Sequence, residues 1–298
     1  MSTHRDDVPS PPLRAVQSLW AMEDLPSTAA PWTLDQQIAL LVEADYSAVA
    51  VDLGARKAPT APVLAGALHG VPLERIVFAF AGTDVQLADA LRYAERIDAT
   101  EMVLCASSYV QDVHEAAAQV QRWHAQAAAS GVDLQLETHR NTLTNDLRFT
   151  RRLVEVLDPA ISLAIDLSHY IVGAEIPAEP TEEIEEQIGV ILSRAGSLQG
   201  RIASRCQVQL PLHHRSSEPW IALARRWWRQ GFAALLDRRG GDGIAPVTFV
   251  TELGTAPYAL ADADGVELSD RWAEARTLLS WAAEDLAAAS SLRAPVPL

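Results

Sequence analysis

The sequence contains little cysteine, methionine or aromatic residue. Among its 298 residues are two cysteines, three methionines and 6% aromatic residues. No Cys-x-x-Cys pair is present, which excludes a structural zinc site of the finger type. Cys105 and Cys206 both lie in apolar stretches that we interpret as strands. We therefore expect two buried core thiols in a reduced, cytoplasmic protein.

The sequence also lacks long apolar runs and an excess of basic residues. No apolar run approaches the roughly 18 residues of a membrane-spanning helix, and the first residues lack the apolar core of a signal peptide. With 24 Lys and Arg against 39 Asp and Glu, the net charge is -15. Such a surface repels phosphate backbones and anionic lipids, so we expect no nucleic acid or membrane partner. The expected partner is a small molecule, and the sequence is compatible with either a monomer or a homo-oligomer.

Short apolar runs alternate with longer amphipathic stretches along the whole chain. The expected strands are residues 15–22, 48–53, 75–81, 101–106, 133–138, 161–167, 206–213 and 247–252. A helical pattern follows each run, and Gly131 and Gly196 are expected to end two of these helices. Parallel strands need crossover helices, so eight such units predict an α/β fold, a single-domain (β/α)8 TIM barrel. A doubly wound open sheet is the competing fold.

The barrel is expected to leave short segments at both ends of the chain. The sequence predicts a disordered segment over residues 1–13, the barrel over 14–289 and a flexible tail over 290–298.

Four consecutive expected strands end in a side chain that can bind a metal ion. These side chains belong to Glu137, Asp166, His213 and Glu252, which follow one another after 29, 47 and 39 residues. One βα unit of such a barrel takes roughly 31 residues, and its strand ends meet at one mouth. Three carboxylates brought together there repel one another unless a cation lies among them. This oxygen-rich set favours Mn²⁺ or Mg²⁺, with Co²⁺ and Zn²⁺ as alternatives.

Neighbouring residues are expected to line the pocket. His139 lies two residues after Glu137, so on a strand it points to the same side. Trp20 lies near the end of the first expected strand and either forms an apolar pocket wall or packs in the core. His214 should point away from His213, although an irregular strand end would let the two exchange roles.

The segments that end these strands resemble a known superfamily. They are Glu137-Thr138-His139-Arg140, Asp166-Leu167-Ser168-His169, His213-His214-Arg215 and Glu252-Leu253-Gly254. This ordered set is similar to that of the xylose isomerase-like TIM barrels, which include sugar phosphate isomerases and epimerases and endonuclease IV-like enzymes. The resemblance covers roughly residues 15–281 and is strongest over 131–258. It implies the four metal ligands named above, with His169 and Arg215 as substrate contacts.

Two features depart from the pattern of this superfamily. Relatives often carry a longer loop after the His-x-Arg step, whereas here Arg215 is followed after three residues by the start of a helical pattern at Pro219. Relatives also commonly place a glutamate on the second strand, where the nearest acid is Asp52. A shortened loop opens the pocket or changes the substrate.

The expected function is a divalent-metal-dependent isomerase or epimerase of a keto-sugar or related polyol. In this hypothesis the metal polarises the carbonyl, and Glu137 or Glu252 removes the adjacent proton to give a metal-bound cis-enediolate. The other glutamate returns a proton to the opposite face in an epimerase, or the proton returns to the neighbouring carbon in an isomerase. His169 and Arg215 stabilise the negative oxygen.

Three other functions stay open at this point. A metal-dependent lyase or dehydratase uses the same scaffold but expels a hydroxyl group from the enolate. A phosphodiesterase of the endonuclease type needs a larger set of ligands and a basic groove, which 8 histidines and a charge of -15 do not favour. A barrel that binds a small molecule without catalysis is the third.

Overall fold

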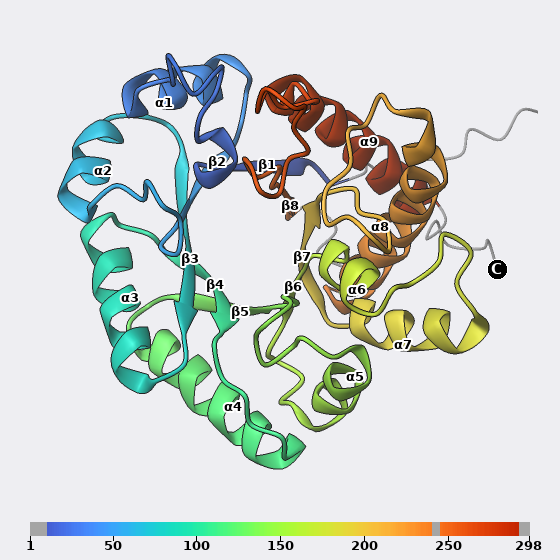
Figure 1. The fold of residues 1–298 in the computed structure, drawn as a ribbon. Coiled ribbons are helices and arrows are strands. Elements are labelled where there is room, and N and C mark those ends of the chain that lie inside the picture. Colours follow the sequence, from blue (N-terminus) through green and yellow to red (C-terminus); the bar gives the residue numbers. More distant parts are fainter. Residues whose placement is uncertain (1–10, 240–244, 292–298) are drawn as a thin grey trace, which may run out of the picture.

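Eight parallel strands form a closed barrel in the computed structural model, which describes residues 11–239 and 245–291 (Figure 1). The strands are β1 (Leu13–Ser18), β2 (Ala48–Asp52), β3 (Glu74–Ala81), β4 (Glu101–Ala106), β5 (Asp133–Glu137), β6 (Leu163–Ile165), β7 (Ala195–Gly200) and β8 (Val247–Thr251). Each strand pairs with the next along the chain, and β8 pairs with β1 to close the barrel. The predicted (β/α)8 TIM barrel is confirmed, and the open-sheet alternative is wrong.

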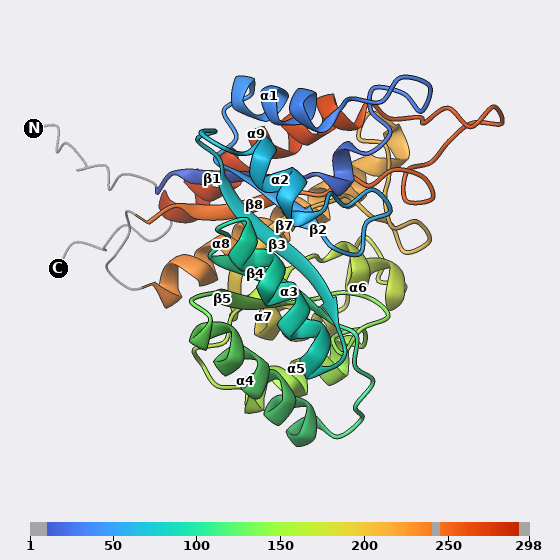
Figure 2. The same cartoon turned by 90° about the vertical axis from the view of Figure 1, so that its left-hand side faces the viewer.

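Helices connect successive strands and surround the barrel (Figures 1 and 2). They are α1 (Leu34–Glu43), α2 (Ala61–Ala67), α3 (Asp84–Arg96), α4 (Val113–Ala129), α5 (Leu147–Val156), α6 (Ser168–Gly173), α7 (Glu182–Leu192), α8 (Glu218–Arg238) and α9 (Arg271–Ser291), with short 3-10 helices η1 (Trp20–Met22) and η2 (Arg215–Ser217). Several begin at a capping side chain; Asp112, for example, accepts hydrogen bonds from the first backbone amides of α4. The chain leaves α4 through Gly131, whose φ of 74° favours glycine, as predicted.

The core has two layers because alternate strand residues face opposite sides of the sheet. A small inner cluster fills the barrel and includes Val16, Ile76, Phe78, Val103 and Val250. A much larger cluster lies between the sheet and the helices. Both faces of a parallel barrel strand are buried, which explains why the strands appear in the sequence as nearly continuous apolar runs.

The prediction of a seventh strand over residues 206–213 is wrong. The strand at this place is β7, Ala195–Gly200, and the predicted end of the preceding helix at Gly196 lies inside it, since α7 ends at Leu192. The short segment Ala-Gly-Ser-Leu-Gln-Gly lacks an apolar run because the neighbouring strand crowds it: a Cβ at Gly200 would lie 2.6 Å from the Phe249 ring. Residues 206–213 instead belong to the long connection between β7 and α8.

The two cysteines differ in their surroundings. Cys105 on β4 is buried, as predicted, whereas Cys206 is exposed, which makes the second prediction wrong. Cys206 follows β7 in the connection to α8, so its apolar neighbours in the sequence do not form a strand.

The predicted terminal segments lie largely outside the described residues. Within the described ranges, β1 begins at Leu13 and α9 continues to Ser291, each slightly beyond the predicted barrel limits of residues 14 and 289. No helix in the described part of the chain is long and apolar enough to cross a membrane.

Candidate active site

A cavity of about 290 Å³ opens at the C-terminal mouth of the barrel. It is lined by Trp20, Asp52, Gly54, Phe78, Phe80, Cys105, Glu137, His139, Arg201, Glu252 and Tyr258. The polar residues come from the ends of β2, β4, β5, β7 and β8, because side chains at the last inward position of each strand meet above the inner core. The cavity therefore occupies the place where this fold carries active sites.

Three of the four predicted metal ligands lie together at this mouth. Glu137 and Glu252 line the cavity, and Asp166 lies beside them through a shared partner, the guanidinium of Arg201. All three carboxyl groups are buried, with residue exposures of 1%, 5% and 0% for Glu137, Glu252 and Asp166. Glu137 is the last residue of β5, and Asp166 and Glu252 directly follow β6 and β8. The sequence predicted the positions of these three strands, which explains why the spacing found the residues.

His213 does not join this group. Its side chain is 68% exposed, and its Nδ1 lies 3.5 Å from a carboxylate oxygen of Glu274. The predicted role of His213 as a ligand depended on a seventh strand that does not exist at this position. Its neighbour His214 instead caps η2 by accepting a hydrogen bond from the Ser216 amide, so neither histidine reaches the cavity.

Arg201 directly follows β7 and lies at the barrel mouth, where the prediction placed His213. Its Nε lies 3.2 Å from Oδ2 of Asp166, and its Nη2 donates to Oε2 of Glu252 at 2.9 Å. The guanidinium lies 5.4 Å from the ring centre of Trp20 and 4.9 Å from that of Tyr258. Burial by itself lowers the pKa of Arg201, but attraction to the buried carboxylates outweighs it and raises the pKa above its usual value. The sequence reasoning missed this residue because it searched for acids and imidazoles alone.

The two cavity glutamates bind protons more tightly than ordinary carboxyl groups. Burial raises the pKa of Glu252 to about 8, although the positive charge of Arg201 opposes the shift. Burial and the nearby Glu252 raise the pKa of Glu137 well above its usual value. The thiol of Cys105 donates a hydrogen bond to Oε2 of Glu137 at 2.8 Å. These are the conditions that produce carboxyl groups able to exchange protons near neutral pH.

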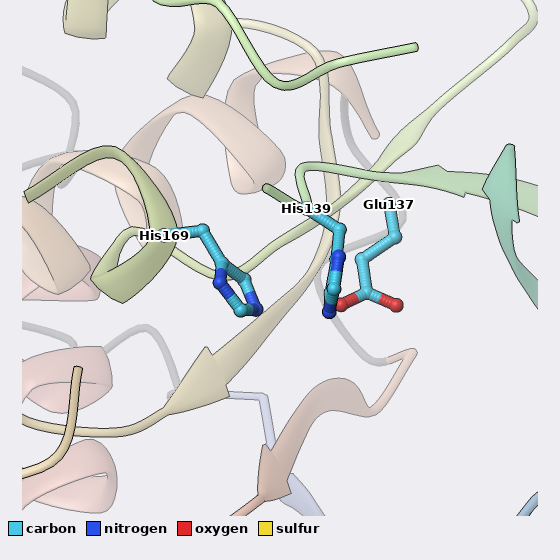
Figure 3. A group of neighbouring side chains, drawn as sticks. All are labelled: Glu137, His139 and His169. Carbon is cyan, nitrogen blue, oxygen red and sulfur yellow. The ribbon is translucent and has the colours of Figure 1, made fainter. Parts of the chain in front are cut away.

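Two histidines lie against Glu137, and Figure 3 shows the three side chains directed toward a common region. Ligand atoms of Glu137, His139 and His169 lie within 4.8 Å of one another, and the two imidazole ring centres are 4.0 Å apart. Burial lowers the pKa of His139 to about 4 and that of His169 well below its usual value. Both rings are therefore neutral at physiological pH, which is the form that binds metal ions.

Hydrogen bonding leaves ring nitrogens free for such an ion. Nδ1 of His139 lies 2.5 Å from the carbonyl oxygen of Arg140, which assigns the proton to Nδ1 and leaves the lone pair on Nε2. Nε2 of His169 lies 3.4 Å from Oδ2 of Asp166, and neither ring nitrogen makes a hydrogen bond within the described ranges. One carboxylate and two such imidazoles fit a single divalent ion.

This donor set changes the expected metal. With Asp166 and Glu252 bound to a guanidinium, the remaining ligands are nitrogen-rich instead of oxygen-rich. Imidazole ligands suit Zn²⁺, Fe²⁺ and Co²⁺ and are also compatible with Mn²⁺, whereas Mg²⁺ prefers oxygen. The predicted preference for Mn²⁺ or Mg²⁺ rested on an oxygen-rich set of ligands, and the identity of the metal stays a prediction.

The other predicted pocket residues divide into two groups. Trp20, at the start of η1, lies in the cavity wall and packs edge to face on Tyr258 with ring centres 5.0 Å apart. Gly254 allows this packing, because a Cβ there would overlap the Trp20 ring. Arg215, in contrast, is exposed at the start of η2 and does not line the cavity.

Metal addition should stabilise the protein through the two buried histidines. Zn²⁺ or Co²⁺ at about a hundred times its Kd is expected to raise Tm by about 4 °C, since such binding adds about 2.7 kcal/mol to the unfolding free energy. The His139→Ala and His169→Ala variants should lose this shift relative to their own metal-free Tm, and His213→Ala should keep it. A shift that depends on His213 would contradict this assignment. Differential scanning fluorimetry of chelator-treated protein measures all four forms.

Comparisons with known proteins identify the fold. No protein-family model matches the chain, and a comparison with curated proteins finds no match. Its structural neighbours are xylose isomerase-like TIM barrel proteins and sugar epimerases, and they also include a protein described as a probable 3-DHS dehydratase. These similarities show the barrel fold that the sequence motifs suggested.

Three neighbours illustrate the range. D-Psicose 3-epimerase from Clostridium cellulolyticum H10, solved with D-tagatose, has a TM-score of 0.59 at 13% identity. The match covers 92% of this chain and 99% of the epimerase chain. A xylose isomerase-like TIM barrel protein from Mycobacterium smegmatis, solved with magnesium, has a TM-score of 0.55 at 12% identity, covering 93% and 98%. A fusion of such a barrel with 4-hydroxyphenylpyruvate dioxygenase has a TM-score of 0.57 at 11% identity; the match covers 96% of this chain but only 45% of the fusion protein.

Proposed function

We propose that this cavity is the active site of an isomerase or epimerase that acts on a keto-sugar or a related polyol. The observation that carries the proposal is the pair of buried carboxyl groups, Glu137 and Glu252, which line one cavity beside a buried guanidinium. Moving a proton between two faces or two neighbouring carbons requires two acid–base groups within reach of the same atoms. Because β5 and β8 are separated by two strands, the two groups approach a bound molecule from different sides.

The remaining residues of the cavity suit a small polyhydroxy compound. Aromatic rings of Trp20, Phe80 and Tyr258 offer apolar surfaces to its C–H groups and exclude water. The deprotonated form of Glu252, which a pKa of about 8 makes increasingly available as the pH rises above neutral, removes the proton beside the carbonyl. In the epimerase, Glu137 returns a proton. The two oxygens of Glu137 allow it to act both as an acid–base group and as a ligand.

A divalent ion held by Glu137, His139 and His169 would supply Lewis-acid chemistry, polarising a substrate oxygen and making the neighbouring C–H bond more acidic. The magnesium-bound neighbour from Mycobacterium smegmatis and the sugar-bound epimerase support a metal and a sugar-like substrate at this fold. The net charge of -15 does not favour a nucleic acid or membrane partner. The cytoplasmic location stays a prediction.

A dehydratase is the second candidate. The pKa of Glu252, about 8, keeps this carboxyl largely protonated at neutral pH, so it can donate a proton to a departing hydroxyl group. A dehydratase among the structural neighbours supports this alternative. It uses the same cavity and differs only in the fate of the enolate.

Solvent exchange separates the candidates. With metal-loaded protein in D₂O and a panel of ketopentoses and ketohexoses, we expect deuterium to enter the carbon beside the carbonyl, with formation of an epimer or an aldose, as followed by proton NMR. Loss of water from the sugar would favour the dehydratase. Absence of both reactions over the whole panel would contradict an enzyme of either type acting on these ketoses and favour a barrel that only binds small molecules.

A further inference from the structure

One nitrogen of the Arg201 guanidinium is left without a partner. Nε faces Asp166 and Nη2 donates to Glu252, but Nη1 makes no hydrogen bond in the part of the chain that the structure describes. The side chain is 1% exposed, so the donor is largely shielded from bulk solvent. Buried donors of charged groups are rarely left unpaired, because an unmet hydrogen bond is costly, and an unpaired one calls for an explanation such as a catalytic role or a bound ion.

The surroundings of Arg201 hold its guanidinium group in one place. Two carboxyl groups hold the planar guanidinium at its Nε and Nη2 positions, and the rings of Trp20 and Tyr258 lie within 5.4 Å of it. A fork of donors held in this way is already oriented before a ligand arrives. Arg201 lines the same cavity as Glu137 and Glu252, so a molecule positioned for proton exchange lies beside it.

We propose that Arg201 binds the substrate carbonyl oxygen through Nη1 and stabilises the negative charge that this oxygen gains during the reaction. This role rests on the proposed function. The C–H bond beside the carbonyl breaks and its proton passes to the Glu252 carboxylate. The electron pair of that bond forms a carbon–carbon double bond, and the carbonyl π pair moves to the oxygen, where the N–H of Arg201 receives the negative charge.

The alternative is that Arg201 is only a counter-charge for Asp166 and Glu252. A counter-charge needs the two carboxylate contacts but gives no reason for a third nitrogen that is buried and has no partner among the described residues, in a side chain that lines the cavity. The two roles differ in a measurable way, since only the first predicts that a small molecule with a negative oxygen binds through Arg201.

Binding of glycolate to metal-free protein tests this role without turnover. Glycolate carries a planar, negatively charged carboxylate with a neighbouring hydroxyl group, so it resembles the charged, oxygen-rich cis-enediolate, and ethylene glycol is its neutral counterpart. After EDTA treatment and dialysis, glycolate at pH 6 should raise Tm in a saturable manner, whereas ethylene glycol and sodium chloride at equal concentration should not. Burial raises the pKa of Glu252 to about 8, so at pH 6 this carboxyl is protonated and does not repel the probe.

The decisive variant is the Arg201→Met/Asp166→Asn double substitution, which keeps the net charge and leaves no buried carboxylate at position 166. We expect its Kd for glycolate to rise by about 10- to 100-fold, the usual worth of a charge-assisted hydrogen bond. Arg201→Lys should retain part of the affinity. Arg215→Met, which removes an exposed arginine outside the cavity, should bind glycolate like the wild type.

Two results would overturn the proposal: no glycolate binding by the wild type, or a Kd of the double variant within twofold of the wild-type value. If the double variant does not fold, Arg201→Lys decides, because an unchanged Kd there contradicts recognition by the guanidinium fork. The proposed function fails separately. Glycolate binding through Arg201 without deuterium exchange into any ketose would remove the isomerase and leave Arg201 as an oxyanion-binding residue.

Discussion

Replacing Arg201 with methionine should lower the free energy of unfolding by about 3–5 kcal/mol, the usual cost of removing one partner from a buried ion pair. Asp166 is fully buried and would lose its guanidinium partner, while Glu252 would lose the hydrogen bond from Nη2. Arg201→Lys should cost less, because it keeps the charge but not the fork. Urea denaturation at pH 7 measures the change as a shift in midpoint.

The Arg201→Met/Asp166→Asn variant is the matched control for this loss. Since it also removes the orphaned carboxylate, its stability should lie above that of Arg201→Met alone, which is the sign of coupling between two residues in contact. Surface substitutions usually change the free energy of unfolding by less than about 0.5 kcal/mol. If the value for Arg201→Met differs from that of the wild type by no more than this, the buried ion pair between Arg201 and Asp166 does not exist.

The Glu252→Gln variant should reduce the exchange of the substrate proton by about 10²- to 10⁴-fold, the range that one general acid–base group contributes. Glutamine has nearly the same shape and can still accept a hydrogen bond from Arg201, but it cannot take up a proton. Deuterium incorporation measured by NMR gives the rate for wild type and variant. Exchange within threefold of the wild-type rate would remove Glu252 from the reaction.

The pH dependence of stability supplies the control for Glu252→Gln. The pKa of Glu252 rises from 4.5 to about 8 on folding, so above about pH 4.5 the unfolded chain loses a proton that the folded protein keeps. The contribution of the protonated Glu252 carboxyl to the free energy of unfolding is complete below about pH 4.5 and is lost as the pH rises to about 8. The metal-free variant should therefore lose less stability than the wild type over this range, which would also show that it folds.

The sequence predicted the barrel well because the strands buried on both faces are rich in valine, leucine and isoleucine. Glu137, Asp166 and Glu252 could be found because each follows such a strand. β7 could not be found in the same way, since crowding against Phe249 requires glycine at position 200 and the strand has few apolar residues. Residues 206–213, with Val208, Leu210 and Leu212 in alternation, imitate a strand and made His213 look like a ligand.

The same error concealed the electrostatics of the site. We argued that three converging carboxyl groups require a cation, and the chain itself supplies one in Arg201, which bridges two of the three. A metal ion is then left with Glu137 and the two histidines. His139 was found from its spacing and His169 from the family resemblance, but both were expected to contact substrate. Only their distance from Glu137 in space reveals the possibility of a shared ion, and residue spacing along the chain does not contain that distance.

The division of the mouth between a guanidinium and a metal ion can be tested directly by anomalous diffraction from crystals soaked in Zn²⁺. Our account predicts one peak about 2.0–2.2 Å from ligand atoms of Glu137, His139 and His169, with Arg201 still between Asp166 and Glu252. A peak between Asp166 and Glu252, with the Arg201 side chain displaced, would contradict it.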